Sequence, residues 1–327
     1  MNYTDIIQRA ARLTWRYKVL WILGILLALS GGSGGNTLTY TLNGNSGGMF
    51  PTMGPLWNLP DPGVIAGFVL LCCCLLAALI VVMTIVQYVA RTGLYRAVDQ
   101  IEESGAGLTW RDGLRLGWSN RALRMFLLDL IVGIALFLAA MLLLLVGAAP
   151  LLLLIFDNQA LRIFGIVATV GLELLMFFLI MAAAIVISVL QQFWRRQIAL
   201  ADRSVGEALS LGTDMARRKP GDVAIFWLLM AVIGFVVGIV LIPVFFGLIA
   251  VAAGIGFGLG YGTYALFDSF WLAVLVGAPF FLLIMGLPLL FLQGIFLVFE
   301  SSAWTLAYRD LRPALEPGQE VIPAAPQ

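Results

Sequence analysis

The chain has 327 residues, of which 61% are apolar and 11% charged, with a formal net charge of +1 and no histidine. A soluble domain is about half apolar and about a quarter charged, so this composition excludes a water-soluble globular fold. The absence of histidine removes the commonest general base, metal ligand and near-neutral pH switch. The cysteines, Cys72 to Cys74, are consecutive and point in different directions on a helix. No metal or other cofactor is therefore expected.

Six apolar segments are long enough, or nearly long enough, to cross a bilayer as helices. They are Tyr17–Ser30, Gly63–Ala90, Met125–Ala149, Ile163–Phe193, Val223–Ala252 and Ser269–Phe299. The first is short, but the "SGGSGGN" that follows it lacks a small-x-small cleavage pattern, so a retained helix is expected rather than a signal peptide. Pro243, Pro279 and Pro288 interrupt the last two segments and predict kinks, or a short re-entrant piece before Asp268.

The cations predict the orientation of these spans. Eighteen of the nineteen Lys and Arg residues lie before the first span, in every second loop or after the last span, and only Arg162 lies in the alternate loops. The positive-inside rule assigns the cation-rich side to the cytoplasm. We therefore expect a multi-pass protein of the bacterial cytoplasmic membrane with both termini in the cytoplasm.

A threefold internal repeat is predicted from matched positions spaced near a hundred residues apart. Each copy places an N-cap residue three positions before an acid, which is the capping-box spacing of a helix start: Asn2 with Asp5, Thr109 with Asp112, and Ser204 with Glu207. The expected fold is an all-α polytopic membrane protein, with six spans in three hairpins, each preceded by an interfacial amphipathic helix. Residues 1–312 form a single membrane domain with units of about 1–99, 100–203 and 204–312. Residues 31–62 are an external loop, and residues 313–327 are a disordered tail.

Polar residues inside the apolar segments are the candidate functional site. Glu173 lies about ten residues into the fourth span, ~15 Å deep at the helical rise, where a carboxylate faces a bundle interior or a cavity. It is either a proton or substrate site or a protonated packing residue. Asp129, Glu300, Gln191 and Gln192 lie near the inner ends of their spans. Of these, Asp129 and Glu300 are expected to reach headgroup water or the nearby arginines.

Two further sequence patterns can be interpreted either as binding sites or as purely structural features. The cluster Arg217, Arg218 and Lys219 is expected to contact anionic lipid headgroups, although it also serves as an orientation signal. The stretch "GIGFGLGYG", residues 254–262, resembles a nucleotide loop only superficially, and close helix packing is the preferred interpretation.

The stretches "RLTWRYKVLWILGILLAL", "TWRDGLRLG" and "SVGEALSLGTDMARRKPGD", together with six spans, resemble uncharacterised bacterial multi-pass proteins related to the membrane domain of glycerophosphodiester phosphodiesterases. In that group the phosphodiesterase chemistry belongs to a separate soluble barrel. The resemblance therefore implies a stand-alone membrane module and transfers no functional residue.

No catalytic triad or cation-rich pocket is apparent, so we expect no enzyme activity. The first hypothesis is a non-enzymatic membrane module that scaffolds an unknown protein partner or senses membrane state. The alternative is a transporter or lipid-handling protein with a cavity near Glu173. The lipid bilayer is an expected partner in both cases, and no nucleic acid is expected.

Overall fold

The computed structural model describes residues 2–31, 62–105 and 107–312, and these residues form helices without any strand. The helices are α1 (Tyr3–Arg16), α2 (Val19–Leu29), α3 (Pro62–Ser104), α4 (Trp110–Gly117), α5 (Asn120–Gly147), the short 3₁₀ helix η1 (Ala149–Ile155), α6 (Gln159–Ala201), α7 (Val205–Arg218), α8 (Pro220–Phe267) and α9 (Phe270–Leu311). The all-helical class predicted from the sequence is confirmed. Residues 32–61 of the loop predicted at 31–62, and the tail predicted at 313–327, lie outside the described residues.

Five of these helices are long and apolar enough to cross a membrane: α3, α5, α6, α8 and α9. The remaining apolar helix, α2, has 11 residues and is ~16 Å long at 1.5 Å per residue. That length is about half of a ~30 Å hydrocarbon core. The described residues thus contain five helices of spanning length, and the sixth crossing stays a prediction.

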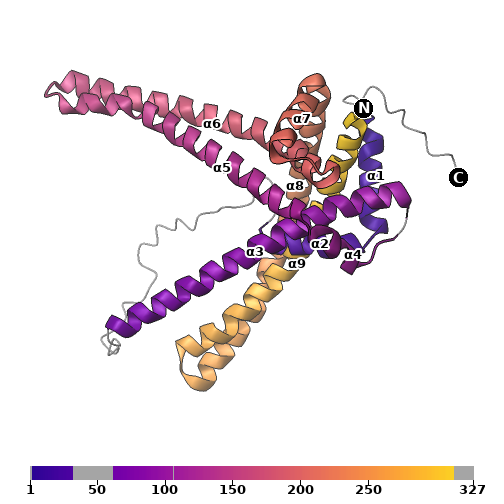
Figure 1. Cartoon of the computed structure of the whole chain (residues 1–327). Coiled ribbons are helices and arrows are strands. Elements are labelled where there is room, and N and C mark those ends of the chain that lie inside the picture. Colours follow the sequence, from indigo (N-terminus) through magenta and orange to yellow (C-terminus); the bar gives the residue numbers. More distant parts are fainter. Residues whose placement is uncertain (1, 32–61, 106, 313–327) are drawn as a thin grey trace.

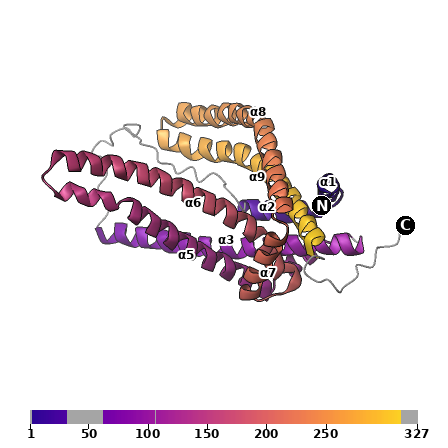
Figure 2. The same cartoon turned by 90° about the horizontal axis from the view of Figure 1, so that it is seen from above.

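The long helices form three arms that diverge from one common region (Figure 1). One arm is α3, the second is the hairpin of α5 and α6, and the third is the hairpin of α8 and α9. Figure 2, turned by 90°, shows all three arms extending to the same side of the molecule. We call the common region the hub: it comprises α1, α2, α4 and α7 with residues 88–104, 120–129, 191–201, 220–230 and 294–311 of the long helices.

The hub contains the hydrophobic core. Leu20, Leu94, Phe226 and Val298 come from four different helices and are at most 1% exposed. Trp304 of α9 packs edge-on against Phe226 at 4.9 Å between ring centroids. Burial of such large side chains contributes roughly 1.5–3 kcal/mol each, so the hub is where protein–protein packing stabilises the chain.

The arms are packed differently. Their buried described residues are all small: Gly147, Gly165, Thr169, Ala252, Gly256, Gly260, Ala273 and Gly277. Gly256 faces Gly277 across the α8–α9 hairpin, where a methyl group on Gly256 would lie 3.1 Å from the Gly277 carbonyl oxygen. The "GIGFGLGYG" stretch is therefore part of a continuous helix that packs closely on its neighbour.

The proline positions do not break their helices. Pro243 lies inside α8, and Pro279 and Pro288 lie inside α9. Figure 2 shows α8 turning sharply along its length, as the predicted kinks require. Helix α8 runs unbroken from Pro243 to Phe267, and the re-entrant piece suggested for this region stays a prediction.

Each of three shorter helices packs against a long helix. Helix α4 packs on α3, α7 packs on α6, and α1 packs on α9. A methyl group on Gly117 of α4 would overlap the Val89 carbonyl oxygen, so glycine is required for this approach. On α7, Gly212 lies against Trp194 in the same way, 2.5 Å from a built methyl group to the indole ring.

The helix starts follow the predicted capping boxes at two of three positions. Thr109 with Asp112, and Ser204 with Glu207, each exchange both hydrogen bonds of the box. The hydrogen bonds that Asp112 accepts from Thr109 lower the pKa of its carboxyl group below the usual range. The side-chain cap expected at Asn2 is wrong: Asn2 occupies the N-cap position of α1, but its side chain accepts from the Thr4 hydroxyl instead. The Asp5 carboxylate pairs with Arg9 at 3.0 Å.

Candidate functional site

Polar side chains from all three arms meet where the arms join the hub. We call this group the arginine cluster; it consists of Tyr88, Arg91, Tyr95, Asp129, Gln191, Gln192, Arg195, Arg196, Glu300, Ser301 and Thr305. The three arginines are 1–8% exposed, and each follows an apolar stretch of its helix. The arginines are located there because the apolar run of each helix ends at this point. The next helical turns carry charged side chains, which pair with groups on the neighbouring helices.

Asp129 of α5 connects its own arm to α3. Its carboxylate accepts a hydrogen bond from Arg195 Nε of α6 at 2.9 Å and pairs with Arg91 of α3 at 3.4 Å. The Tyr88 hydroxyl of α3 donates to the same carboxylate at 3.1 Å. Three donors compensate the negative charge of this nearly buried carboxylate. Removing the carboxylate would take the shared anion from two buried guanidinium groups.

Arg196 connects α6 to the third arm through neutral partners. Its guanidinium donates to the Gln192 carbonyl at 2.7 Å, to the Gln192 side chain at 2.9 Å and to the Ser301 carbonyl at 3.2 Å. It also donates to the Thr305 hydroxyl at 3.3 Å and lies 4.5 Å above the centre of the Tyr95 ring. Arg196 thereby contacts α3 and α9 at once, and hydrogen bonds of this kind to a charged group each contribute ~1.5–3 kcal/mol.

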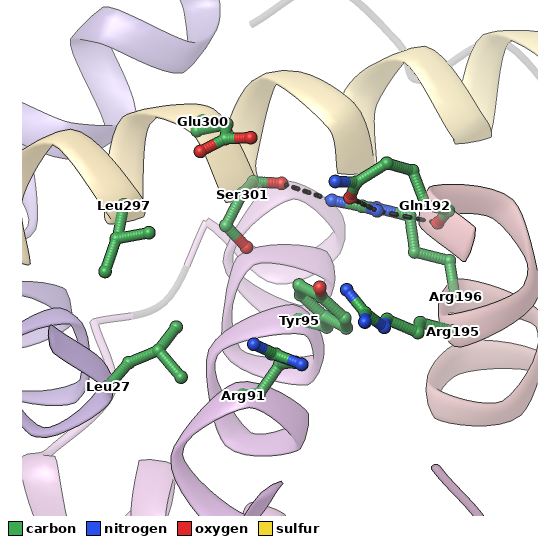
Figure 3. A pocket seen from close by; sticks show the side chains of 9 residues that line it. All are labelled: Leu27, Arg91, Tyr95, Gln192, Arg195, Arg196, Leu297, Glu300 and Ser301. Carbon is green, nitrogen blue, oxygen red and sulfur yellow. Dashed lines mark hydrogen bonds between the residues drawn. The ribbon is translucent and has the colours of Figure 1, made fainter. Parts of the chain in front are cut away.

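A small cavity lies at the centre of the cluster (Figure 3), with a volume of about 30 Å³. Arg91, Arg195, Glu300 and Ser301 line it. The Ser301 hydroxyl is buried without a hydrogen-bond partner, and no hydrogen bond or ion pair to Glu300 occurs within the described residues. The space holds about one water molecule, which would satisfy the Ser301 hydroxyl.

The cluster carries more positive than negative charge, with three arginines against Asp129 and Glu300. Buried cations without an equal number of carboxylates are costly unless they are hydrogen-bonded. The arrangement binds helices together through fixed, directional contacts. It offers neither a nucleophile with an adjacent base nor a group of three His, Cys, Asp or Glu side chains for a metal among the residues that the structure describes.

The structure brings together four of the five predicted intramembrane polar residues. Asp129, Gln191, Gln192 and Glu300 belong to the arginine cluster. Glu173 lies apart, against Gly147 in the α5–α6 arm, where a methyl group on the glycine would be 3.0 Å from its carboxylate. It is 19 residues before Gln192 on the same helix, roughly 28 Å away at the helical rise.

Sequence reasoning missed the three arginines as members of this site. Arg91, Arg195 and Arg196 were interpreted as orientation signals, which is the usual role of cations at the ends of spans. Their position in the sequence could have indicated the site, because these arginines directly follow the apolar runs, near the same ends of the spans as Asp129 and Glu300. The predicted lipid contacts Arg217, Arg218 and Lys219 are exposed at the junction of α7 and α8.

The fold and the cluster define an all-helical protein whose five long apolar helices suggest a membrane-embedded, multi-pass class. Comparison with protein families assigns the chain to a family within this class. Residues 7–316 match a family of unknown function, DUF7544, and the chain belongs to that family. Nothing in this match links it to glycerophosphodiester phosphodiesterases, so the resemblance drawn from its sequence is not supported. Comparison with curated proteins and with solved structures gave no match.

Proposed function

We propose that this protein is a non-enzymatic membrane module that senses the state of the bilayer. The observation that supports the proposal is the position of the arginine cluster, where all three arms contact one another. Beyond the hub, the arms diverge (Figure 1), and their large apolar side chains, such as Leu145 and Leu266, are exposed.

Lipid would fill the space between diverging arms, so the angle between them depends on the bilayer. A spanning helix that is longer than the local hydrocarbon thickness adapts by tilting or bending, at a modest free-energy cost per ångström. Helices α6 and α8 have 43 and 48 residues, which exceeds the ~20 that a span requires. A change in bilayer thickness would therefore move the arms about the cluster that joins them.

The finer architecture belongs to the same proposal. We infer that α2 is part of a sixth crossing, that the hub faces the cytoplasm of a bacterium, and that the three units form a pseudo-threefold ring. The packing of α1, α4 and α7 on α9, α3 and α6 supports this ring. In this arrangement, movement of the arms would reposition the interfacial helices, which are the surface available to an unknown protein partner.

Distances between the arm tips test the proposal. Spin labels at Leu145→Cys and Leu266→Cys, with Cys72 to Cys74 replaced by serine, report the separation of the α5–α6 and α8–α9 arms by pulsed electron paramagnetic resonance. In bilayers of increasing acyl length, we expect the main distance to change monotonically. A distance that is the same in every bilayer would contradict the sensing function.

Asp129→Asn and Glu173→Gln form a matched pair for this measurement, since each removes one carboxylate from a spanning segment. Loss of Asp129 takes the shared carboxylate from Arg91 and Arg195, so the distance distribution should broaden and stop following acyl length. Glu173→Gln changes a contact within one arm and should behave like the unaltered protein. If both variants follow acyl length equally, the cluster does not couple the arms.

A second candidate, lipid handling, is favoured by a hollow of about 550 Å³ between α3 and α5. Ile80, Ile85 and Phe126 form apolar walls, and Ser119, whose buried hydroxyl has no partner, lies at its inner end. Such a volume is within the ~300–1,000 Å³ of small-molecule sites. Vesicles containing the protein would then exchange labelled lipid between leaflets faster than empty vesicles, and Thr84→Trp in the hollow would slow the exchange. Rates equal to those of empty vesicles would eliminate this candidate.

A further inference from the structure

A second hollow lies between α1 and the end of α3 and has a volume of about 210 Å³. Three arginines of α1 line it, namely Arg9, Arg12 and Arg16, together with Tyr17, Ile101 and Glu102. The arginines are three and four residues apart, so they lie on one face of α1. The Tyr17 hydroxyl donates to the Gly105 carbonyl at 3.2 Å, which ties the end of α1 to the end of α3.

The charge of this hollow is only partly compensated. Arg9 pairs with Asp5 at 3.0 Å and with Glu102 at 3.1 Å. Arg12 and Arg16 are exposed and have no carboxylate partner within the described residues. The Arg16 guanidinium lies 5.8 Å from the centre of the Tyr17 ring, which holds it beside the hollow. The Nε–H of Arg9 is buried without an acceptor. The hollow therefore presents two uncompensated cations and an unused donor.

The position of the hollow coincides with the boundary between polar and apolar sequence. Helix α2 begins at Val19, three residues after Arg16, and Trp15 is 66% exposed. Trp15 packs edge-on against Trp21 at 5.7 Å, and the Trp21 indole donates to the Thr14 carbonyl at 2.8 Å. Tryptophan at such a boundary sits at the level of lipid headgroups.

We propose that this hollow binds the phosphate group of an anionic membrane lipid, with Arg12 and Arg16 as the ligands and Trp15 against the lipid beside it. Guanidinium groups match phosphate oxygens through paired hydrogen bonds, and free cations at headgroup level favour anionic lipid. The inference requires only that the chain is embedded in a membrane and is independent of bilayer sensing. It assigns lipid binding to residues other than the predicted Arg217, Arg218 and Lys219.

Helix α4 provides a matched control. Arg111 and Arg115 are also exposed cations on an interfacial helix, and Arg111 lies 5.2 Å from the Trp110 ring centre. The double variants Arg12→Gln/Arg16→Gln and Arg111→Gln/Arg115→Gln therefore remove equal charge from exposed positions of two short helices. Only the first pair lines the hollow.

The experiment measures binding of phosphatidylglycerol and of phosphatidylcholine to the full chain in uncharged detergent by native mass spectrometry. We expect phosphatidylglycerol to bind more tightly, and Arg12→Gln/Arg16→Gln to weaken it by about thirtyfold, as two basic groups at an anionic surface would. The α4 pair should change it by less than about threefold. Equal weakening by both pairs would show general surface attraction and would overturn the proposal.

Two further measurements complete the test. Inorganic phosphate is added as a competitor, and displacement of the lipid at equal concentration would identify a free-anion site and overturn the choice of a lipid. Arg12→Lys/Arg16→Lys keeps the charge and addresses the possibility that the glutamine variant fails to fold. We expect a partial loss of affinity from the lysine variant, because lysine lacks the planar fork; unchanged affinity would contradict the proposed geometry.

Discussion

The hub and the arms belong to the same long helices, yet different surroundings stabilise them. On α8, Phe226 is 1% exposed in the hub, whereas Phe235, nine residues further along, is 70% exposed in the α8–α9 arm. In the hub, large side chains and paired charges from several helices are in contact. In the arms, glycine and alanine pack within a hairpin, and large side chains face outward.

This difference separates two sources of stability. Protein packing and hydrogen bonds hold the hub together, whereas the apolar outer surface of the arms is favourable only in lipid. Contacts between arms outside the hub contribute little, because lipid tails are as apolar as the side chains they would replace. Substitutions in the hub should therefore change the stability of the protein, and matched substitutions at outward-facing positions of the arms should not.

The largest contrast is expected from Phe226→Ala and Phe235→Ala. The first leaves a cavity beside Trp304 in the core and should destabilise the protein by ~3–5 kcal/mol. The second removes a lipid-facing ring and should change the free energy of unfolding by less than about 0.5 kcal/mol. Titration with a denaturing detergent, followed by tryptophan fluorescence, measures both. Equal losses would mean that the arms are packed against protein.

A smaller contrast is expected between two glycines. Gly117→Ala places a methyl group on the Val89 carbonyl oxygen and forces α4 away from α3, which should cost ~1–3 kcal/mol. Gly133 of the α5–α6 arm has nothing within 4 Å of a built methyl group, so Gly133→Ala should not destabilise. Amide hydrogen exchange in α4 checks the outcome, and protection retained in Gly117→Ala would argue against close packing there.

The smallest contrast lies within the hub, at the helix starts. Thr109→Ala removes the hydroxyl that accepts from the Asp112 backbone N–H and should cost ~1 kcal/mol. Asn2→Ala removes a side chain that caps no backbone group and should cost only a few tenths. Thermal unfolding of the two variants in the same lipid mixture compares them. A larger loss from Asn2→Ala would mean that its side chain caps α1 in the membrane.

Several features followed directly from the sequence. Long apolar runs can only be helices in a bilayer, because every backbone group must bond within its own segment; the predicted all-helical class is therefore confirmed. The capping boxes at Thr109 and Ser204 were also predictable, since a hydroxyl and an acid three residues apart interact locally. The cap at Asn2 was not, because the Asn2 side chain accepts from the Thr4 hydroxyl instead of from a backbone N–H.

The sequence by itself determined the helical segments, their apolar lengths and the polar residues at their ends. Those properties depend on local hydrogen bonding and on transfer into lipid, which neighbouring residues decide. Only the tertiary structure decided that Asp129 pairs with Arg91 and Arg195, while Glu173 remains within one arm. These pairings join residues 38 and 66 positions apart, and they depend on how the arms converge on the hub.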